Sequence, residues 1–250
     1  MIENLKKFVR KKNNYIFWIT NPNLINIEIA IENNFFDIFV VDYEHSIMSL
    51  NEIRSIITLL NIKKIPIFMR FAKFNIHEIP KFLDFGINGI ILSDVNSQKQ
   101  LNLIKNISLY PKTGSRGVGL GRMNRHGENF KSYLKKINKN LVILPMIEQD
   151  IELNEIEKIY SDNNVDGCLI GPYDLSMSIG KPGNFYTTEF KRIQNFILKM
   201  KKKYKKAAGL HFMDHEFKKF ALLKKKGFNF LPILTDVQFF KIGINFKIKK

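Results

Sequence analysis

The chain has 250 residues, of which 45% are hydrophobic, and a formal net charge of +17 at pH 7. This length suits one large α/β domain, and the apolar content is sufficient for a full core. No apolar run approaches the ~20 residues that span a bilayer, so we expect no membrane protein.

The N-terminal segment and the cysteine content indicate a cytoplasmic protein. Residues 1–14 are charged and contain no apolar stretch ahead of a cleavage site, so we expect no secretory signal. Cys168 is the only cysteine, which rules out an intramolecular disulfide and suits a reducing compartment.

The positive charge comes mostly from lysines that are spread over the predicted helices. Clusters such as 199–206 and 224–226 fit exposed helix ends, where positive charge also favours the helix dipole. The sequence has no zinc-finger or RNA-recognition signature, so we do not expect a nucleic-acid-binding protein. A basic scaffold that binds acidic polymers stays open as the non-enzymatic alternative.

Short apolar runs alternate with amphipathic segments along the whole chain. The runs are rich in Ile, Val and Phe and are mostly continuous, which is typical of strands that are buried on both faces of a parallel sheet. We predict strands at 15–20, 37–42, 65–71, 88–93, 141–147, 165–170, 207–212 and 228–234. We predict helices at about 22–34, 49–61, 75–85, 96–108, 150–161, 187–205 and 214–226.

Eight such βα units in 250 residues predict a single TIM-barrel domain that covers residues 1–250. An open doubly wound sheet is the alternative, but the sequence lacks a glycine-rich dinucleotide fingerprint after an early strand. The segment 109–128 breaks the rhythm with five glycines and three arginines. We expect this segment to form a functional loop over the barrel mouth.

Polar residues follow two early strands at the points where those strands end. Asp42 ends one strand and His45 lies just beyond it, so the aspartate could orient the imidazole as a general base. Arg70 ends the next strand and could bind a carboxylate or an enolate oxygen. The alternatives are that His45 merely caps the next helix and that Arg70 forms an ion pair with Asp42 or Asp94.

Two further acids, Glu148 and Asp174, are each the first carboxylate after an apolar run. The C-terminal edge of a parallel barrel is where ligands and metals bind, so these acids could share one divalent cation such as magnesium. Gly171 and Pro172 precede Asp174, and the glycine would let a substrate approach the backbone at a helix start. A salt bridge for Glu148, an N-cap for Asp174 and a simple tight turn remain open.

These residues, in this order, resemble the HpcH/HpaI family of metal-dependent 2-oxo-acid aldolases. The resemblance runs from about Phe17 to Asp236. It is carried by the stretches Val-Val-Asp-Tyr-Glu-His (40–45), Pro-Ile-Phe-Met-Arg (66–70), Tyr-Pro-Lys-Thr-Gly-Ser-Arg-Gly-Val-Gly (110–119), Ile-Glu (147–148), Val-Asp-Gly-Cys-Leu-Ile-Gly-Pro-Tyr-Asp-Leu-Ser (165–176), Met-Ser-Ile-Gly-Lys-Pro-Gly (177–183) and Ala-Gly-Leu-His (208–211).

The resemblance implies a TIM barrel, a Mg²⁺- or Mn²⁺-type ion held by Glu148 and Asp174, and cleavage of a 4-hydroxy-2-oxo acid to pyruvate and an aldehyde. It implies that His45, held by Asp42, is the acid/base and that Arg70 lies on the keto oxygen. Members of this family are commonly hexamers with exchanged helices, so we expect a homo-oligomer.

The same resemblance implies how the substrate is bound. The backbone around Gly171, Pro172 and Asp174 would bind the pyruvate carboxylate, and Arg122 would approach the aldehyde end. Two residues depart from the family pattern, which often has glycine where Tyr43 stands and glutamine where Met146 stands. Tyr43 would narrow the mouth, and Met146 cannot donate a hydrogen bond. A CoA-thioester lyase on the same barrel remains the enzymatic alternative.

Overall fold

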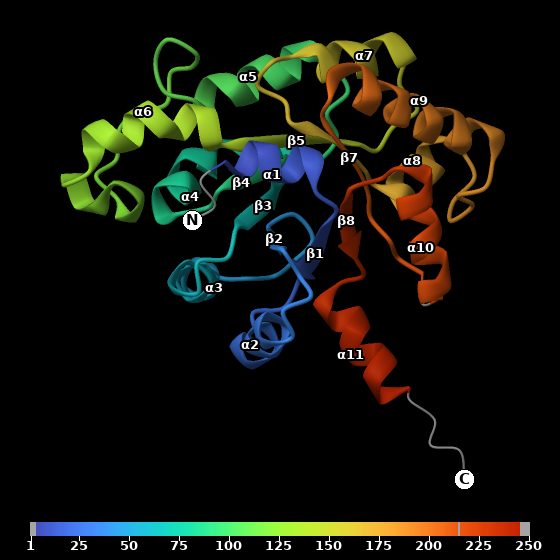
Figure 1. Ribbon diagram of the computed structural model, residues 1–250, viewed down its shortest axis with the longest axis horizontal. Coiled ribbons are helices and arrows are strands. Elements are labelled where there is room, and N and C mark those ends of the chain that lie inside the picture. Colours follow the sequence, from blue (N-terminus) through green and yellow to red (C-terminus); the bar gives the residue numbers. More distant parts are fainter. Residues whose placement is uncertain (1–3, 215, 246–250) are drawn as a thin grey trace.

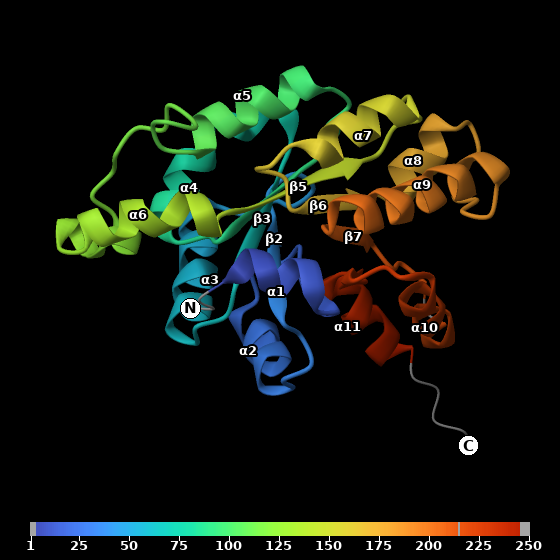
Figure 2. The ribbon, with the colours of Figure 1, turned by 45° about the horizontal axis from the view of Figure 1, so that its top comes forward.

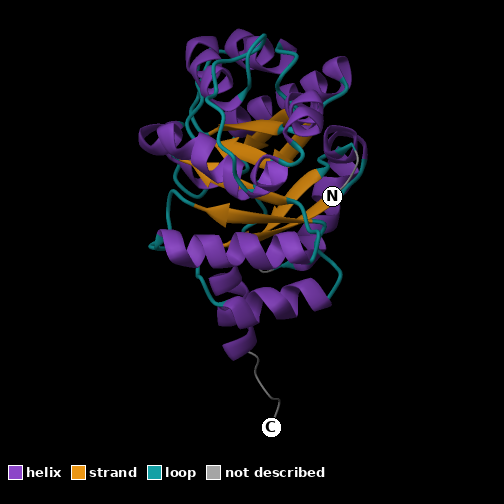
Figure 3. Cartoon of the chain, turned by 90° about the vertical axis from the view of Figure 1, so that its left-hand side faces the viewer, coloured by secondary structure: helices purple, strands orange, loops and turns teal. Residues whose placement is uncertain are grey.

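A computed structural model of the protein describes residues 4–214 and 216–245. Its centre is a closed barrel of eight parallel strands in the order β1-β2-β3-β4-β5-β6-β7-β8, with helices packed around it (Figures 1 and 3). The strands are β1 (Asn14–Ile19), β2 (Ile38–Asp42), β3 (Ile67–Phe71), β4 (Gly89–Leu92), β5 (Val142–Ile147), β6 (Gly167–Ile170), β7 (Ala207–Leu210) and β8 (Phe230–Ile233). The prediction of a TIM barrel with eight strands is therefore confirmed.

The helices fall in the predicted positions, and the structure adds several that the sequence analysis did not predict. The predicted helices are α2 (Leu24–Glu32), α3 (Leu50–Ile62), α4 (Ile79–Phe85), α5 (Gln98–Ser108), α7 (Leu153–Ser161), α9 (Thr188–Tyr204) and α10 (Phe217–Lys226). The predicted helix 75–85 begins as the 3₁₀ segment η1 (Lys73–Glu78) and continues as α4. The additional elements are α1 (Leu5–Lys11), α6 (Phe130–Asn140), α8 (Pro172–Ser178), α11 (Asp236–Ile244) and the 3₁₀ segment η2 (Arg122–Gly127). No helix of the described chain is long and apolar enough to cross a membrane.

Side chains alternate between the two faces of each strand, which produces two apolar layers. The outer layer packs between the strands and the helices and includes Val41, Met69 and Ile147. The inner layer fills the barrel and includes Ile38, Val40 and Phe68. Leu5 and Val9 of α1 join the inner layer, and α1 lies against the centre of the barrel in Figures 1 and 2.

The glycine-rich segment 109–128 packs on the outer wall of the barrel. It connects α5 to α6, so it begins at the end of a helix and not at the end of a strand. Asp84 of α4 anchors it, because buried Arg116 binds the Asp84 carboxylate at 2.5 Å. A Cβ atom on Gly119 would lie 2.3 Å from that carboxylate, so a side chain at this position would displace Asp84. Within one chain, the expected position over the barrel mouth is therefore wrong.

Candidate active site at the barrel mouth

On β2, β3 and β5, the alternation of side chains carries one polar residue from each to the inner rim of the barrel. Ile38 and Val40 face the interior, so Asp42 at the end of β2 faces inward as well. Arg70 follows Phe68 on β3 by the same rule, and Glu148 comes two residues after Met146 on β5. These polar residues are nearly buried, with exposed fractions of 1% for Asp42, 8% for Arg70 and 7% for Glu148.

Asp42 and Arg70 form a buried two-point ion pair across neighbouring strands. Their Cα atoms are register partners, the Arg70 Nε donates to Asp42 Oδ1 at 2.9 Å, and Arg70 Nη2 donates to Asp42 Oδ2. Burial by itself raises the pKa of Asp42, but the Arg70 charge outweighs it and holds that pKa below its usual value. Asp42 is therefore an anion, and its first function is to fix the guanidinium.

Trp18 and His211 complete the floor beneath this ion pair. The indole Nε1 of Trp18 donates to Asp42 Oδ2 at 3.1 Å, and the Arg70 guanidinium lies 5.3 Å from the indole ring centroid. The His211 ring lies 4.6 Å from the Trp18 ring, and its Nε2 lies 2.8 Å from the Leu234 carbonyl oxygen. Burial lowers the pKa of His211 to about 4, so it is neutral near pH 7.

The sequence analysis expected the Asp42 carboxylate to orient the His45 ring, but the structure does not pair these two groups. Asp42 Oδ1 instead accepts hydrogen bonds from the backbone N–H groups of Glu44 and His45, at 3.0 and 3.1 Å. The His45 side chain is 65% exposed, and its Nε2 lies 4.0 Å from Glu44 Oε2. Asp42 therefore shapes the loop that carries His45 through its Oδ1, while Arg70 donates to both of its carboxylate oxygens.

Glu44 is the residue of this site that the sequence analysis missed. Its Oε1 accepts from the Ser93 hydroxyl at 2.7 Å, and its Oε2 lies 3.3 Å from Arg70 Nη1. The signal was present, because Glu44 stands between the two residues that were singled out, Asp42 and His45. Alternation along a strand could not find it, since Glu44 lies in the loop beyond β2.

Glu148 is a buried acid in an environment that opposes its charge. Its Oε2 accepts from the Asp94 backbone N–H at 2.7 Å. Burial raises its pKa to about 7, and the Glu44 and Asp174 carboxylates add to the rise, whereas Arg70 opposes it. A Cβ atom on residue 171 would lie 2.6 Å from Glu148 Oε1, so Gly171 is needed for the backbone to come this close. A cation would relieve the cost of ionising Glu148.

Asp174 lies on the first turn of α8, directly after strand β6. Pro172 begins the helix, and Asp174 is exposed while Leu175 and Ser176 are buried beneath it. Its charge contributes to the raised pKa of Glu148, so the two carboxylates interact through space. No group of three or more His, Cys, Asp or Glu side chains in the described chain is arranged to hold a metal. Two carboxylates do fit a hard cation that completes its shell with water or substrate oxygens.

Tyr43 turns away from the barrel interior, contrary to the expectation that it narrows the mouth. Its hydroxyl donates to Glu78 Oε1 at 3.1 Å, and its ring meets Phe82 edge-on at 5.1 Å. The Asn75 amide also donates to the Tyr43 carbonyl oxygen at 3.1 Å. Tyr43 thus ties the loop after β2 to η1 and α4. Met146 belongs to the inner apolar layer and is 1% exposed.

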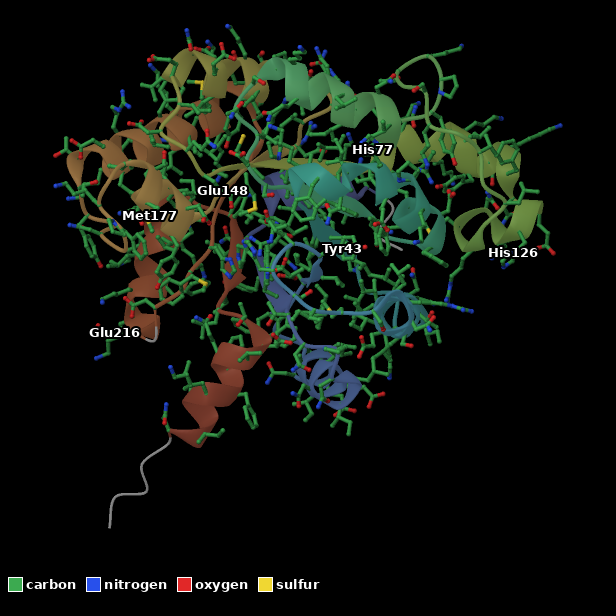
Figure 4. All side chains as sticks on the ribbon, turned by 180° about the vertical axis from the view of Figure 1, so that it is seen from behind. Tyr43, His77, His126, Glu148, Met177 and Glu216 are labelled. Carbon is green, nitrogen blue, oxygen red and sulfur yellow. The ribbon has the colours of Figure 1, made fainter. Side chains whose placement is uncertain are left out.

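Arg122 is not brought to the strand-end residues. Its Nη1 donates to Thr58 on α3 at 3.0 Å, in a cavity between α3, α4 and η2 that Lys81 and His126 also line. Figure 4 places His126, four residues after Arg122, near the edge of the molecule and well away from Glu148. A role for Arg122 at the aldehyde end is therefore not supported by the geometry of a single chain.

Comparison with known proteins places this geometry in context. Residues 14–230 match the family model described as HpcH/HpaI aldolase/citrate lyase. The 2-keto-3-deoxy-L-rhamnonate aldolase of Salmonella typhi is 25% identical over 246 residues, which is 97% of this chain and 91% of that protein.

Two crystal structures share the fold. The HpcH/HpaI aldolase from Desulfitobacterium hafniense DCB-2 has a TM-score of 0.84 and 20% identity, covering 96% of this chain and 92% of that one. The HpcH/HpaI aldolase/citrate lyase family protein from Burkholderia cenocepacia J2315 has a TM-score of 0.87 and 19% identity, covering 96% and 95%.

Proposed function

Because the chain belongs to the HpcH/HpaI aldolase/citrate lyase family, we propose that it is a metal-dependent aldolase acting on a 4-hydroxy-2-oxo acid. It cleaves this acid to pyruvate and an aldehyde, or catalyses the reverse condensation. The observation that carries the proposal is the buried Glu148 carboxylate, which interacts with Asp174 at the same rim as the Arg70 guanidinium. The name of the Salmonella typhi relative agrees with a substrate of this class.

Glu148 and Asp174 are the proposed ligands of a divalent cation of the Mg²⁺ or Mn²⁺ type. When bound there, such an ion would act as a Lewis acid toward the 2-oxo group and would supply positive charge for the enolate. Carboxylate oxygens are the donors that these hard ions prefer. The raised pKa of Glu148, about 7, supports the assignment, because its protein surroundings alone do not neutralise its charge.

The chain's own residues supply the remaining chemistry. Arg70, held rigidly by Asp42, donates toward the keto oxygen and stabilises its growing negative charge. The backbone around Gly171 and Asp174 binds the 1-carboxylate through the N–H groups of Tyr173 and Asp174, which have no acceptor within α8. The Gly171 N–H already donates to Ile147, and Pro172 has no N–H. His45, exposed at the mouth, removes the proton from the 4-hydroxyl group, and the C3–C4 bond breaks as the aldehyde carbonyl forms. The electron pair of that bond passes into the enolate, which becomes pyruvate when C3 takes up a proton.

Removal of divalent metal tests this function directly. We expect a chelator to abolish cleavage of 4-hydroxy-2-oxo acids and added Mg²⁺ or Mn²⁺ to restore it, measured as pyruvate release. The reaction needs no lysine Schiff base, so borohydride in the presence of pyruvate should leave the protein mass unchanged. Full turnover in chelator, or a trapped pyruvate adduct, would contradict the proposal. Condensation of pyruvate with a panel of aldehydes, followed by mass measurement, then identifies the partner aldehyde.

We also propose that the protein is a cytoplasmic homo-oligomer, and a hexamer is the assembly expected from the family. The buried free thiol of Cys168 suits a reducing compartment.

Large apolar side chains on α2 and α11 are exposed, with 61% for Ile29 and 63% for Phe240. Such side chains on neighbouring helices favour contact with another copy. Light scattering should therefore give a molar mass several times 29.3 kDa, and a monomer mass would reject this part.

A further inference from the structure

The Glu44 carboxylate lies close to three polar side chains at the barrel mouth, each from a different part of the chain. Its carboxylate accepts from Ser93 after β4, lies 3.3 Å from Arg70 Nη1 of β3, and lies 4.0 Å from His45 Nε2 in its own loop. The Glu44 side chain is only 15% exposed, so these contacts fix its position.

The two oxygens of Asp42 are already engaged by other donors. Oδ1 accepts from Arg70 Nε and from two backbone N–H groups, and Oδ2 accepts from Arg70 Nη2 and from the Trp18 indole. Glu44 differs, because its Oε2 is buried and lies 3.3 Å from Arg70 Nη1 but accepts no hydrogen bond within the part of the chain that is described. The His45 Nε2 lies 4.0 Å from this oxygen, which is within ion-pair distance but beyond hydrogen-bond distance.

We infer that Glu44, and not Asp42, is the positioning residue that orients the His45 imidazole, whereas Asp42 orients Arg70. This inference builds on the proposed function, in which His45 takes the proton of the 4-hydroxyl group. A carboxylate beside a histidine base fixes which ring nitrogen carries the proton and stabilises the imidazolium that forms. Ser93 and Arg70 hold Glu44 in the place where it can do so.

Neutralising Glu44 and neutralising Asp42 should therefore change different kinetic constants. Glu44→Gln keeps the size of the side chain and an acceptor for Ser93, and it leaves the Asp42–Arg70 pair intact. It should lower kcat ~10²-fold, at the lower end of what general acid–base catalysis contributes, with little change in KM for the 2-oxo acid. Asp42→Asn should loosen Arg70 and raise that KM.

The first test is a spectroscopic measurement on the full-length protein without substrate. The ring ¹⁵N signals of His45, identified by their loss in His45→Ala, should move further in Glu44→Gln than in Asp42→Asn, which alters only the backbone contacts of the His45 loop and the Arg70 pair. Glu128→Gln, at an exposed acid on the outer wall, is the charge-matched control. Signals that respond to Asp42→Asn but not to Glu44→Gln would overturn the inference.

The second test is a double-mutant cycle in turnover. If Glu44 acts through His45, the double variant Glu44→Gln/His45→Ala should be no slower than His45→Ala alone. If the fold-losses in kcat of the two single variants multiplied in the double variant, the inference would be overturned. A Glu44→Gln variant that lost stability but kept kcat would also overturn it. Glu44→Asp, which keeps the charge, should recover part of the rate. If the wild-type protein showed no turnover while the ¹⁵N response held, the proposed function would fail and the Glu44–His45 pairing would stand.

Discussion

Asp174→Ala should give a folded protein that binds Mn²⁺ or Mg²⁺ weakly and cleaves its substrate at least ~10²–10³-fold more slowly. The substitution removes one of the two proposed carboxylate donors and leaves Glu148 alone. It should cost little stability, because the exposed Asp174 side chain makes no hydrogen bond or ion pair with any described residue. Its favourable interaction with the start of α8 is of the order of 0.3–1 kcal/mol.

Three measurements separate this expectation from simple unfolding. The circular dichroism spectrum should be unchanged, the heat of Mn²⁺ binding in a calorimetric titration should disappear, and the rate of pyruvate release should fall. Glu152→Ala removes another exposed acid, just ahead of α7, and should retain both metal binding and turnover. Normal cleavage by Asp174→Ala in the presence of chelator would remove Asp174 from the site.

The positions of Asp42, Arg70 and Glu148 could be predicted from sequence because two regularities combine. Apolar runs locate the buried strands, and the ends of parallel strands meet at one rim. Alternation then decides which side of the barrel each side chain faces, as Val40 before Asp42 and Met146 before Glu148 illustrate. These rules depend only on local pattern, so a single sequence is enough to apply them.

The partner of each side chain could not be predicted in the same way. Asp42 could have contacted either His45 or Arg70, and the register of β2 with β3 decided for Arg70. Alternation says nothing about loop residues, which is why Glu44 was missed. The position of the segment 109–128 could not be predicted for the same reason, because the ion pair of Arg116 with Asp84 joins residues that are far apart in sequence.

Glu148→Gln should stabilise the metal-free protein at pH 8 while it abolishes metal binding. Burial raises the pKa of Glu148 from 4.5 to about 7, so the folded state holds this proton more tightly than the unfolded state. The free energy of unfolding therefore falls as pH rises from about 4.5 through 7 and stays low above that range. At about 1.4 kcal/mol per pH unit, the ionised carboxylate costs the fold up to about 3 kcal/mol.

Glutamine removes this cost because it is neutral, and its carbonyl oxygen can still accept from the Asp94 N–H. Urea unfolding in chelator should therefore show the variant more stable than the wild type by about 1–3 kcal/mol at pH 8, with the difference vanishing near pH 4.5. Added Mg²⁺ should reverse the order, since only the wild type gains stability from binding. Equal stabilities in chelator at pH 8 would mean that Arg70 already compensates the Glu148 charge, and the main physical support for a cation at this rim would be lost.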